Sequence, residues 1–312
     1  MKGKAFLLLM VLLAWQGYSQ FSKTHYLPPL SGSDNPGSSA QEQYIYISTP
    51  NLSPVNFTIK QLGGQNIYGT VSKTNPYVYD CGYGTNTQLM VSNSAVSSVL
   101  NNKGFIIEAE DLIYATVRII AGNGNQSGAV VSKGIAALGK EFRVGSFLNP
   151  NNGGLGNNVH TFIAVLATEN NTTVQFSGIQ PNVVLINNPG GSNPAPVILN
   201  SGESYVLAVE GPTTANLNGL IGALVSADKP IAVNCGSFTG SNASQNLDLG
   251  FDQIVSAERT GKEYIFIKST GQDIVERVLL IAHEDNTEIF LNGNTTTAAY
   301  TLNAGNYVAL DG

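Results

Sequence analysis

Three histidines are the side chains of this sequence best suited to acid–base chemistry or metal binding: His25, His160 and His283. None of them has a second ligand-like residue at the short spacings that metal sites use. In an earlier, similar stretch of the chain, the position that matches His283 is Thr168. A position beside a turn accommodates histidine or threonine, whereas a metal site would lose its ligand if threonine replaced histidine. We therefore predict structural roles for the histidines, with no metal, no cofactor and no catalytic residue.

Two acidic tetrads have the residue types of half a calcium site, Glu-Asn-Asn-Thr at 169–172 and Glu-Asp-Asn-Thr at 284–287. Calcium takes about six or more oxygen ligands, and neither tetrad has the spacing of a known acidic calcium loop. Asn and Asp set tight turns by hydrogen bonding to nearby backbone, so we predict turns. Asp248 and Asp252 in 247–253 are a weaker alternative. A carboxylate pair for glycoside hydrolysis stays open, because the sequence does not give separations in space.

Cys81 and Cys235 are the only cysteines. A disulfide between them would close a loop of about 155 residues and stabilise the fold by roughly 5 kcal/mol through chain entropy. The alternative is two small buried thiols, since Cys235 precedes Gly236 at an expected strand end. The sequence leaves both interpretations open.

The N-terminus has the pattern of a secretory signal peptide. A short basic segment precedes eleven apolar residues at 5–15, too few to span a bilayer as a helix. We predict a signal peptide at 1–19 and export to the cell surface or the medium. No later stretch is long and apolar enough for a membrane span. The formal net charge of −6 argues against nucleic-acid binding, which needs a basic surface.

Short β-rich runs closed by Gly, Pro, Asn or Asp fill the chain after an expected extended lead-in at 20–41. A helix candidate occurs at 92–102, and a hairpin is expected across Glu110-Asp111. Asn292-Gly293 is the sharpest turn signal, because a two-residue hairpin needs positive φ at both central positions. The glycine-rich segment 121–134 is interpreted as a strand connection, since no helix start follows it as a phosphate loop requires. Strands and turns together are expected over 261–270, 279–293 and 302–310. The other expected strands are 44–48, 55–61, 67–71, 77–79, 88–91, 105–109, 113–120, 142–147, 161–167, 173–176, 182–186, 197–199, 205–209, 223–226 and 231–234.

The chain repeats itself. ENNTTVQFSG at 169–178 matches EDNTEIFLNG at 284–293 without a gap, and GKEFRV at 139–144 matches GKEYIF at 261–266. Looser matches join 108–117 with 226–235 and 201–211 with 304–312. We predict β units at 42–138 and 139–260, with a truncated third unit at 261–312. The last unit stops where its partner still continues, so further C-terminal domains are expected.

These phrases, together with SADKPIAVNCG at 226–236, resemble the IgGFc-binding protein N-terminal domain family over roughly residues 40–312. The similarity is strongest to bacterial members found at the front of large exported proteins of gliding, Bacteroidota-type bacteria. The resemblance implies a modular, secreted all-β protein that binds or adheres. The sequence departs from the family pattern at Cys235, where many members have serine. The family offers no catalytic motif to transfer.

The sequence thus predicts an all-β protein of tandem antiparallel β-sandwich-like units, with a β-propeller-like or other closed β array as the alternative. The expected function is a non-enzymatic adhesion or binding module for an extracellular protein or glycan. A carbohydrate-active protein, either a glycan-binding module or a hydrolase, is one alternative. A purely structural stalk is another. The ligand-binding residues are not predicted.

Overall fold

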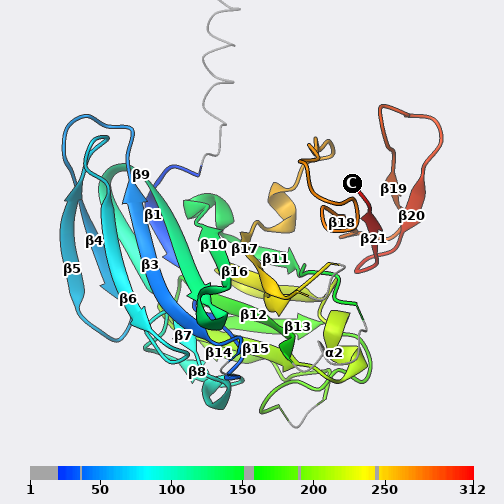
Figure 1. The fold of residues 1–312 in the computed structure, drawn as a ribbon, viewed down its shortest axis with the longest axis horizontal. Coiled ribbons are helices and arrows are strands. Elements are labelled where there is room, and N and C mark those ends of the chain that lie inside the picture. Colours follow the sequence, from blue (N-terminus) through cyan, green and yellow to red (C-terminus); the bar gives the residue numbers. More distant parts are fainter. Residues whose placement is uncertain (1–19, 36, 151–157, 189–190, 243–245) are drawn as a thin grey trace, which may run out of the picture.

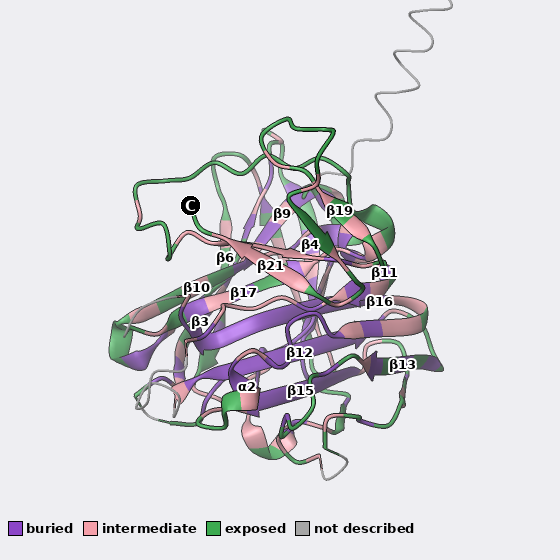
Figure 2. Ribbon diagram, turned by 90° about the vertical axis from the view of Figure 1, so that its right-hand side faces the viewer, coloured by how far each residue is buried: buried purple, intermediate pink, exposed green. Residues whose placement is uncertain are grey.

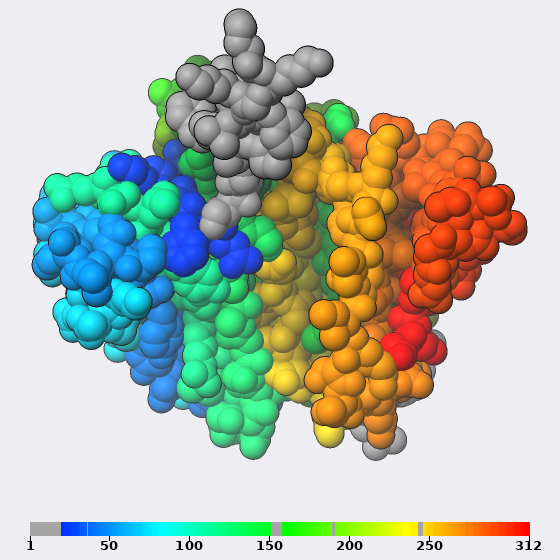
Figure 3. Space-filling view, turned by 90° about the horizontal axis from the view of Figure 1, so that it is seen from above, coloured from blue at the N-terminus to red at the C-terminus, as the bar shows by residue number. Residues whose placement is uncertain are grey.

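The computed structural model describes residues 20–35, 37–150, 158–188, 191–242 and 246–312. The expected signal peptide and part of the loops 149–159 and 187–196 lie outside these residues. The described chain is nearly all β, as predicted. Its N-terminal strands, in blue and cyan, lie at one end, and its orange and red C-terminal strands at the other (Figure 1). The same order is visible from above (Figure 3).

The first set of strands is organised around one long strand, β9 (Phe105–Ala121). Its first half pairs with β1 and β4, and its second half with β3 and β10, all antiparallel. β5 pairs with β4 and β6 pairs with β3, which completes two sheets that share β9. We call this set the first copy. Its other strands are β1 (Ser22–Leu27), β3 (Ala40–Ser48), β4 (Val55–Gln61), β5 (Asn66–Val71), β6 (Tyr77–Tyr83) and β10 (Gln126–Val131).

The second copy repeats this connectivity around β16 (Leu224–Gly240), which is also 17 residues long. The first half of β16 pairs with β11 and β13, and its second half with β12 and β17. β14 pairs with β13 and β15 with β12. The other strands are β11 (Gly139–Arg143), β12 (His160–Ala167), β13 (Thr172–Ser177), β14 (Val197–Leu199), β15 (Ser204–Glu210) and β17 (Asp248–Ile254). The strands β11 to β17 occupy, in this order, positions equivalent to those of β1, β3, β4, β5, β6, β9 and β10 in the first copy.

The third copy has four strands in two antiparallel pairs. β18 (Val278–Ile281) pairs with β21 (Tyr307–Leu310) as β12 pairs with β15. β19 (Thr287–Ile289) pairs with β20 (Tyr300–Leu302) as β13 pairs with β14. Among the described residues, no strand joins the two pairs as β9 and β16 do in the other copies.

Short elements connect these sets. β2 (Leu30–Ser31) pairs in parallel with β7 (Met90–Val91), and β8 (Val99–Leu100) extends the second copy beside β15. The helical elements are the single turns Asn93–Ala95, Gly122–Gly124, Gly134–Ala137 and Ala257–Arg259, and α2 (Thr214–Asn218).

Several local predictions are corrected. Instead of a hairpin across Glu110-Asp111, β9 runs straight through, because each half of it finds two antiparallel neighbours. The two strands expected at 223–226 and 231–234 are likewise one strand, β16. The helix expected at 92–102 is a single turn followed by β8. No strand forms at 182–186 or 261–270. The segment expected as a lead-in contains β1, which pairs with β9.

The first two copies are stacked so that the second closes the core of the first. Ile45 and Ile47 of the first copy belong to a core that also includes Phe162, Ala164 and Phe238 of the second. Ile163 and Val165, which point to the opposite face of β12, fill a second core. All eight residues of β12 are therefore buried, and Figure 2 shows β12 and β15 in purple beside a largely pink β21. Leu279 and Ile281 of β18 lie next to Gly145, at the far side of the second copy.

Candidate functional site

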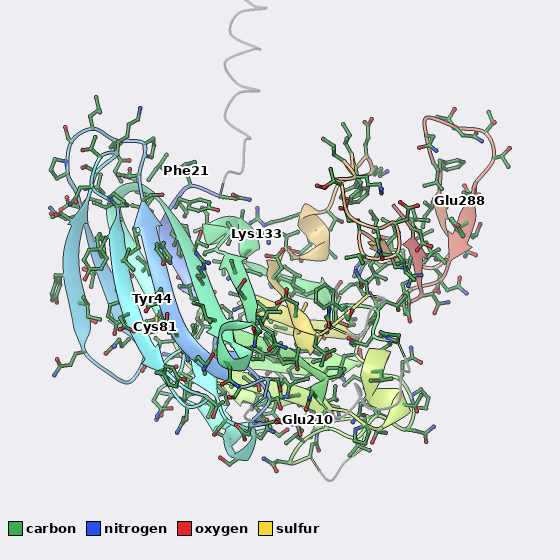
Figure 4. All side chains as sticks on the ribbon, in the orientation of Figure 1. Phe21, Tyr44, Cys81, Lys133, Glu210 and Glu288 are labelled. Atoms are coloured by element: carbon green, nitrogen blue, oxygen red, sulfur yellow. The ribbon has the colours of Figure 1, made fainter. Side chains whose placement is uncertain are left out.

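The first copy presents one sheet face that no other described strand covers. Tyr44 and Tyr46 project from β3 on alternate positions, with ring centroids 6.3 Å apart and rings edge to face. Tyr114, on the neighbouring β9, stacks at a tilt against Phe21 at 5.9 Å. Figure 4 labels Phe21 and Tyr44 on this part of the molecule. We call Tyr44, Tyr46, Tyr114 and Phe21, with the flanking Asp80 and Arg118, the tyrosine face.

The equivalent positions of the second copy explain why this face is unusual. Tyr44 and Tyr46 correspond to Phe162 and Ala164, which are fully buried against the first copy. Tyr46 is 38% exposed. The second copy packs on the Ile45 and Ile47 side of β3, so it leaves the opposite side of the first copy uncovered. It carries phenol rings where the second copy carries core residues.

Hydrogen-bonding groups surround the rings. Strand register sets Tyr44 between Arg118 on β9 and Asp80 on β6. The Tyr44 hydroxyl donates to Glu42 Oε2 at 3.3 Å. The negative charge of Glu42 raises the pKa of Tyr44 above its ordinary value, so the phenol keeps its proton at neutral pH. A flat aromatic surface with charged and hydroxyl groups at its margin can stack a planar face of a ligand and hydrogen-bond its edge.

A second constellation has the order of a hydrolase triad. Ser31 Oγ lies 3.1 Å from His160 Nε2, and His160 Nδ1 lies 3.4 Å from Glu210 Oε1. The hydrogen bonds from His160 and Asn93 lower the pKa of Glu210, whose position Figure 4 labels. Both Ser31 and His160 are wholly buried, so the serine oxygen has no approach for a substrate carbonyl. The group ties the N-terminal segment to β12 and β15.

His25 also has a structural role, as predicted. Its Nε2 lies 3.0 Å from the carbonyl oxygen of Ile113, and its Nδ1 lies 2.9 Å from Ser132 Oγ. Ser132 Oγ in turn bonds Gln253 Oε1 of the second copy at 3.3 Å. Burial lowers the pKa of His25 below its ordinary value. This neutral histidine therefore belongs to a polar network that joins the first two copies.

The first copy has an open surface depression of about 690 Å³. Residues 50–55, Glu110 and Asp111 line it. Both carboxylates are already engaged. Asp111 accepts from Asn51 Nδ2 at 2.7 Å and from the Leu112 N–H at 2.8 Å, and these bonds lower its pKa. Glu110 accepts from Asn56 Nδ2 at 2.8 Å. The lowered pKa keeps Asp111 ionised at neutral pH, which does not suit a general acid.

The acidic tetrads form turns, as predicted. Thr172 Oγ1 donates to the Glu169 carbonyl at 2.8 Å, and Thr287 Oγ1 to the Glu284 carbonyl at 2.7 Å. Asn171 and Asn286, each the third residue of its tetrad, have φ of 55° and 57°. Asp248 and Asp252 also have partners within the protein. Asp248 accepts a hydrogen bond from the Ser127 N–H, and Asp252 forms an ion pair with Lys133 at 2.6 Å.

Cys81 and Cys235 are free thiols on β6 and β16. Cys81 packs in the core shared by the first two copies, and Cys235 in the second core. The structure does not bring them together. Burial raises the pKa of both thiols, that of Cys235 to about 12, which removes thiolate character at neutral pH.

His283 bridges the second and third copies. Its Nε2 lies 3.2 Å from Glu141 Oε2, and its carbonyl oxygen accepts from Arg143 Nη2 at 3.0 Å. In the part of the chain that the structure describes, no group of three or more His, Cys, Asp and Glu side chains could hold a metal ion. Within those same residues, no helix has the length and apolarity to cross a membrane.

The tyrosine face was not predicted from the sequence. The alternation of Tyr44, Ile45, Tyr46 and Ile47 was a signal for a two-faced strand. That the tyrosine side is free follows only from the stacking of the copies, which a single sequence does not give.

A family model described as IgGFc binding protein matches residues 127–311. Because the match covers more than half of the chain, this protein belongs to that family. The matched range begins in β10 and covers the second and third copies, so most of the first copy lies outside it. Neither the curated proteins nor the solved structures contain a match.

Proposed function

We propose that this protein is a non-enzymatic, exported binding module whose tyrosine face binds a glycan. The observation that carries the proposal is the exchange of core residues for half-exposed phenol rings at equivalent positions of the first two copies. Membership of a family described by binding supports a binding role. The antibody ligand in that description is not transferred, because a shared fold does not carry a ligand with it.

A glycan fits the chemistry of the face. Sugar rings present a flat C–H surface that packs on aromatic rings, while their hydroxyls pair with carboxylates and guanidinium groups. The tyrosine face has rings at its centre and Glu42, Asp80 and Arg118 at its margin. A protein ligand would also use tyrosine, and the experiment below separates the two.

The test compares Tyr46→Ala with Tyr68→Ala on a glycan array, followed by titration of the best glycan. Tyr68 is 74% exposed on β5, outside the tyrosine face, and serves as the matched control. We expect Tyr46→Ala to weaken binding about fivefold, because one stacking ring contributes on the order of 1 kcal/mol. Tyr68→Ala should bind like the natural protein.

Both variants should unfold within about 1 kcal/mol of the natural protein, because the substituted rings are exposed. A blank array for the natural protein, or equal loss of binding in both variants, would contradict the proposal. Binding of a protein but of no glycan would favour the alternative ligand class.

A further inference from the structure

Aromatic side chains form a row across the outer face of the first copy, on the neighbouring strands β6, β3 and β9 (Figure 1). Tyr83 on β6 is paired with Glu42 of β3, and Tyr114 on β9 is paired with Ser48 of β3. The two tyrosines of β3 lie between these paired positions, on the same side of the strand. The row, which we call the aromatic row, consists of Tyr83, Tyr44, Tyr46 and Tyr114.

Every ring of the aromatic row is accessible from solvent. Tyr83 is 68% exposed and Tyr46 is 38% exposed, while the other two members are half-buried. Phe21, which is 39% exposed, stacks on Tyr114 and extends the row by one ring. The aromatic row is therefore a surface that a ligand can contact along its whole length.

The aromatic row is long. Its ends lie beside positions 42 and 48 of β3, and a strand advances about 3.3 Å per residue, so the row spans about 20 Å. Its two central rings, those of Tyr44 and Tyr46, have centroids 6.3 Å apart. Since one aromatic ring stacks one sugar ring, the row offers four stacking positions in series. A single sugar or a disaccharide would leave at least two of them uncovered.

The polar groups beside the row match an uncharged chain of sugars. Asp80 on β6 and Arg118 on β9 are the cross-strand neighbours of Tyr44, one on each side. A carboxylate accepts hydrogen bonds and a guanidinium donates them, and a sugar hydroxyl can pair with either group. Glu42 adds a second negative charge, which disfavours a polyanionic chain.

The aromatic row is an open surface. The surface depression at 50–55 with Glu110 and Asp111 contains no member of the row. A pocket encloses the end of a sugar chain, whereas an open face contacts its side, where each added unit adds contact area. The openness of the row therefore favours binding along the side of a chain.

We infer that the tyrosine face, extended by Tyr83, binds the side of an extended, uncharged polysaccharide chain over at least four sugar units. The inference rests on the proposed glycan binding and specifies the form of the glycan. Pyranose chains with β-1,4 linkages are extended and present flat ring faces in series, whereas α-1,4-linked glucose chains coil. The ligand class is therefore a β-1,4-linked chain.

The test is calorimetric titration of the full chain with β-1,4-linked oligosaccharides of glucose, N-acetylglucosamine, mannose and xylose, each with one, two, four and six units. We expect at least one series to bind, with an affinity that rises at least about tenfold from two units to four. Two further stacked rings should contribute about fivefold each. The α-1,4-linked hexasaccharide of glucose is the linkage control, and it should bind at least about tenfold more weakly than the best β-1,4-linked hexasaccharide.

Tyr83→Ala removes the ring at one end of the row. The ratio of four-unit to two-unit affinity should fall about fivefold, because the shorter sugar stacks on the central rings. Tyr83→Phe keeps the ring and removes only the hydroxyl, which accepts from Gln41 Nε2 at 2.8 Å, so the ratio should be retained. Tyr68→Ala changes an exposed tyrosine of β5 outside the row and should also retain it. Circular dichroism verifies that the variants fold.

Three results of the titrations would overturn the inference: equal affinity for two and six units, equal binding of the α-1,4-linked hexasaccharide, or an unchanged ratio in Tyr83→Ala. The absence of binding by all four β-1,4-linked series would overturn it as well. If the glycan array then shows Tyr46-dependent binding of a terminal or charged sugar, the proposed glycan binding stands without the inference. A blank array would contradict both.

Discussion

The second and third copies share turns, hydrogen bonds and strand pairings, yet the strand pairs of the second are buried in a closed core and those of the third are open. β12 is buried throughout, whereas β18 is only half-buried along its whole length. The difference between them is the long central strand. β16 joins both strand pairs and brings β11 into the same sheet, and without such a strand the residues matching β11 form no strand. The same strand pairs therefore form in both copies, and the central strand joins them into one buried core.

The largest effect should come from the equivalent aromatic pair Phe142 and Tyr264. Phe142→Ala removes a fully buried ring covered by β16 and should lower the free energy of unfolding by about 3–5 kcal/mol. Tyr264→Ala truncates an exposed ring and should change it by less than about 0.5 kcal/mol. Urea unfolding followed by circular dichroism measures both. Equal losses of unfolding free energy in the two variants would contradict the difference in burial between the second and third copies.

Acid should destabilise the protein through His25, which lies between the first two copies. The pKa of His25 is lowered in the folded protein, so below its ordinary value of 6.5 the unfolded chain binds a proton that the folded chain does not. Stability should be complete above about pH 6.5 and fall as the pH drops below it. Thermal melts from pH 8 to pH 5.5 test this.

The variant His25→Gln should flatten that fall, because it removes the group whose pKa is lowered by burial. A melting temperature that rises on acidification, or a fall that persists in His25→Gln, would count against the account of the interface.

The smallest effect concerns the matched turns. Thr172→Val removes the bond to the Glu169 carbonyl at a buried site and should cost about 1 kcal/mol. Thr287→Val removes the same bond at a more exposed site, where water replaces it, and should cost less than about 0.5 kcal/mol. Denaturant midpoints compare the two. A larger cost in the third copy would mean that this copy is more tightly packed than its burial indicates.

Sequence patterns were sufficient for features set by neighbouring residues. The strands at 55–61 and 197–199 were predicted to the residue. Asn292-Gly293 has positive φ at both positions, but the two-residue hairpin expected there is wrong, because β19 ends at Ile289 and β20 begins at Tyr300. The single strand β9 was missed because Glu110-Asp111 looks like a turn, and only its partners on both sides keep it extended. The same limit explains 261–270: its β propensity is high, but no strand among the described residues pairs with it.

The tyrosine face was beyond local prediction for a related reason. Tyr46 and Ala164 occupy the same position in two copies of one plan, and their different exposures follow from which copy is stacked against which. Stacking is a long-range property. The buried polar groups around Ser31 and His25 also come from segments that are distant in the sequence, so no residue spacing predicted them.

Hydrogen exchange of the unliganded protein, resolved along the chain by mass spectrometry, tests the central claim most directly. If the long strand is what turns hairpins into a core, amides of β12 and β16 should exchange at least about 100-fold more slowly than those of β18 and β19. Equal protection of the second and third copies would contradict the account.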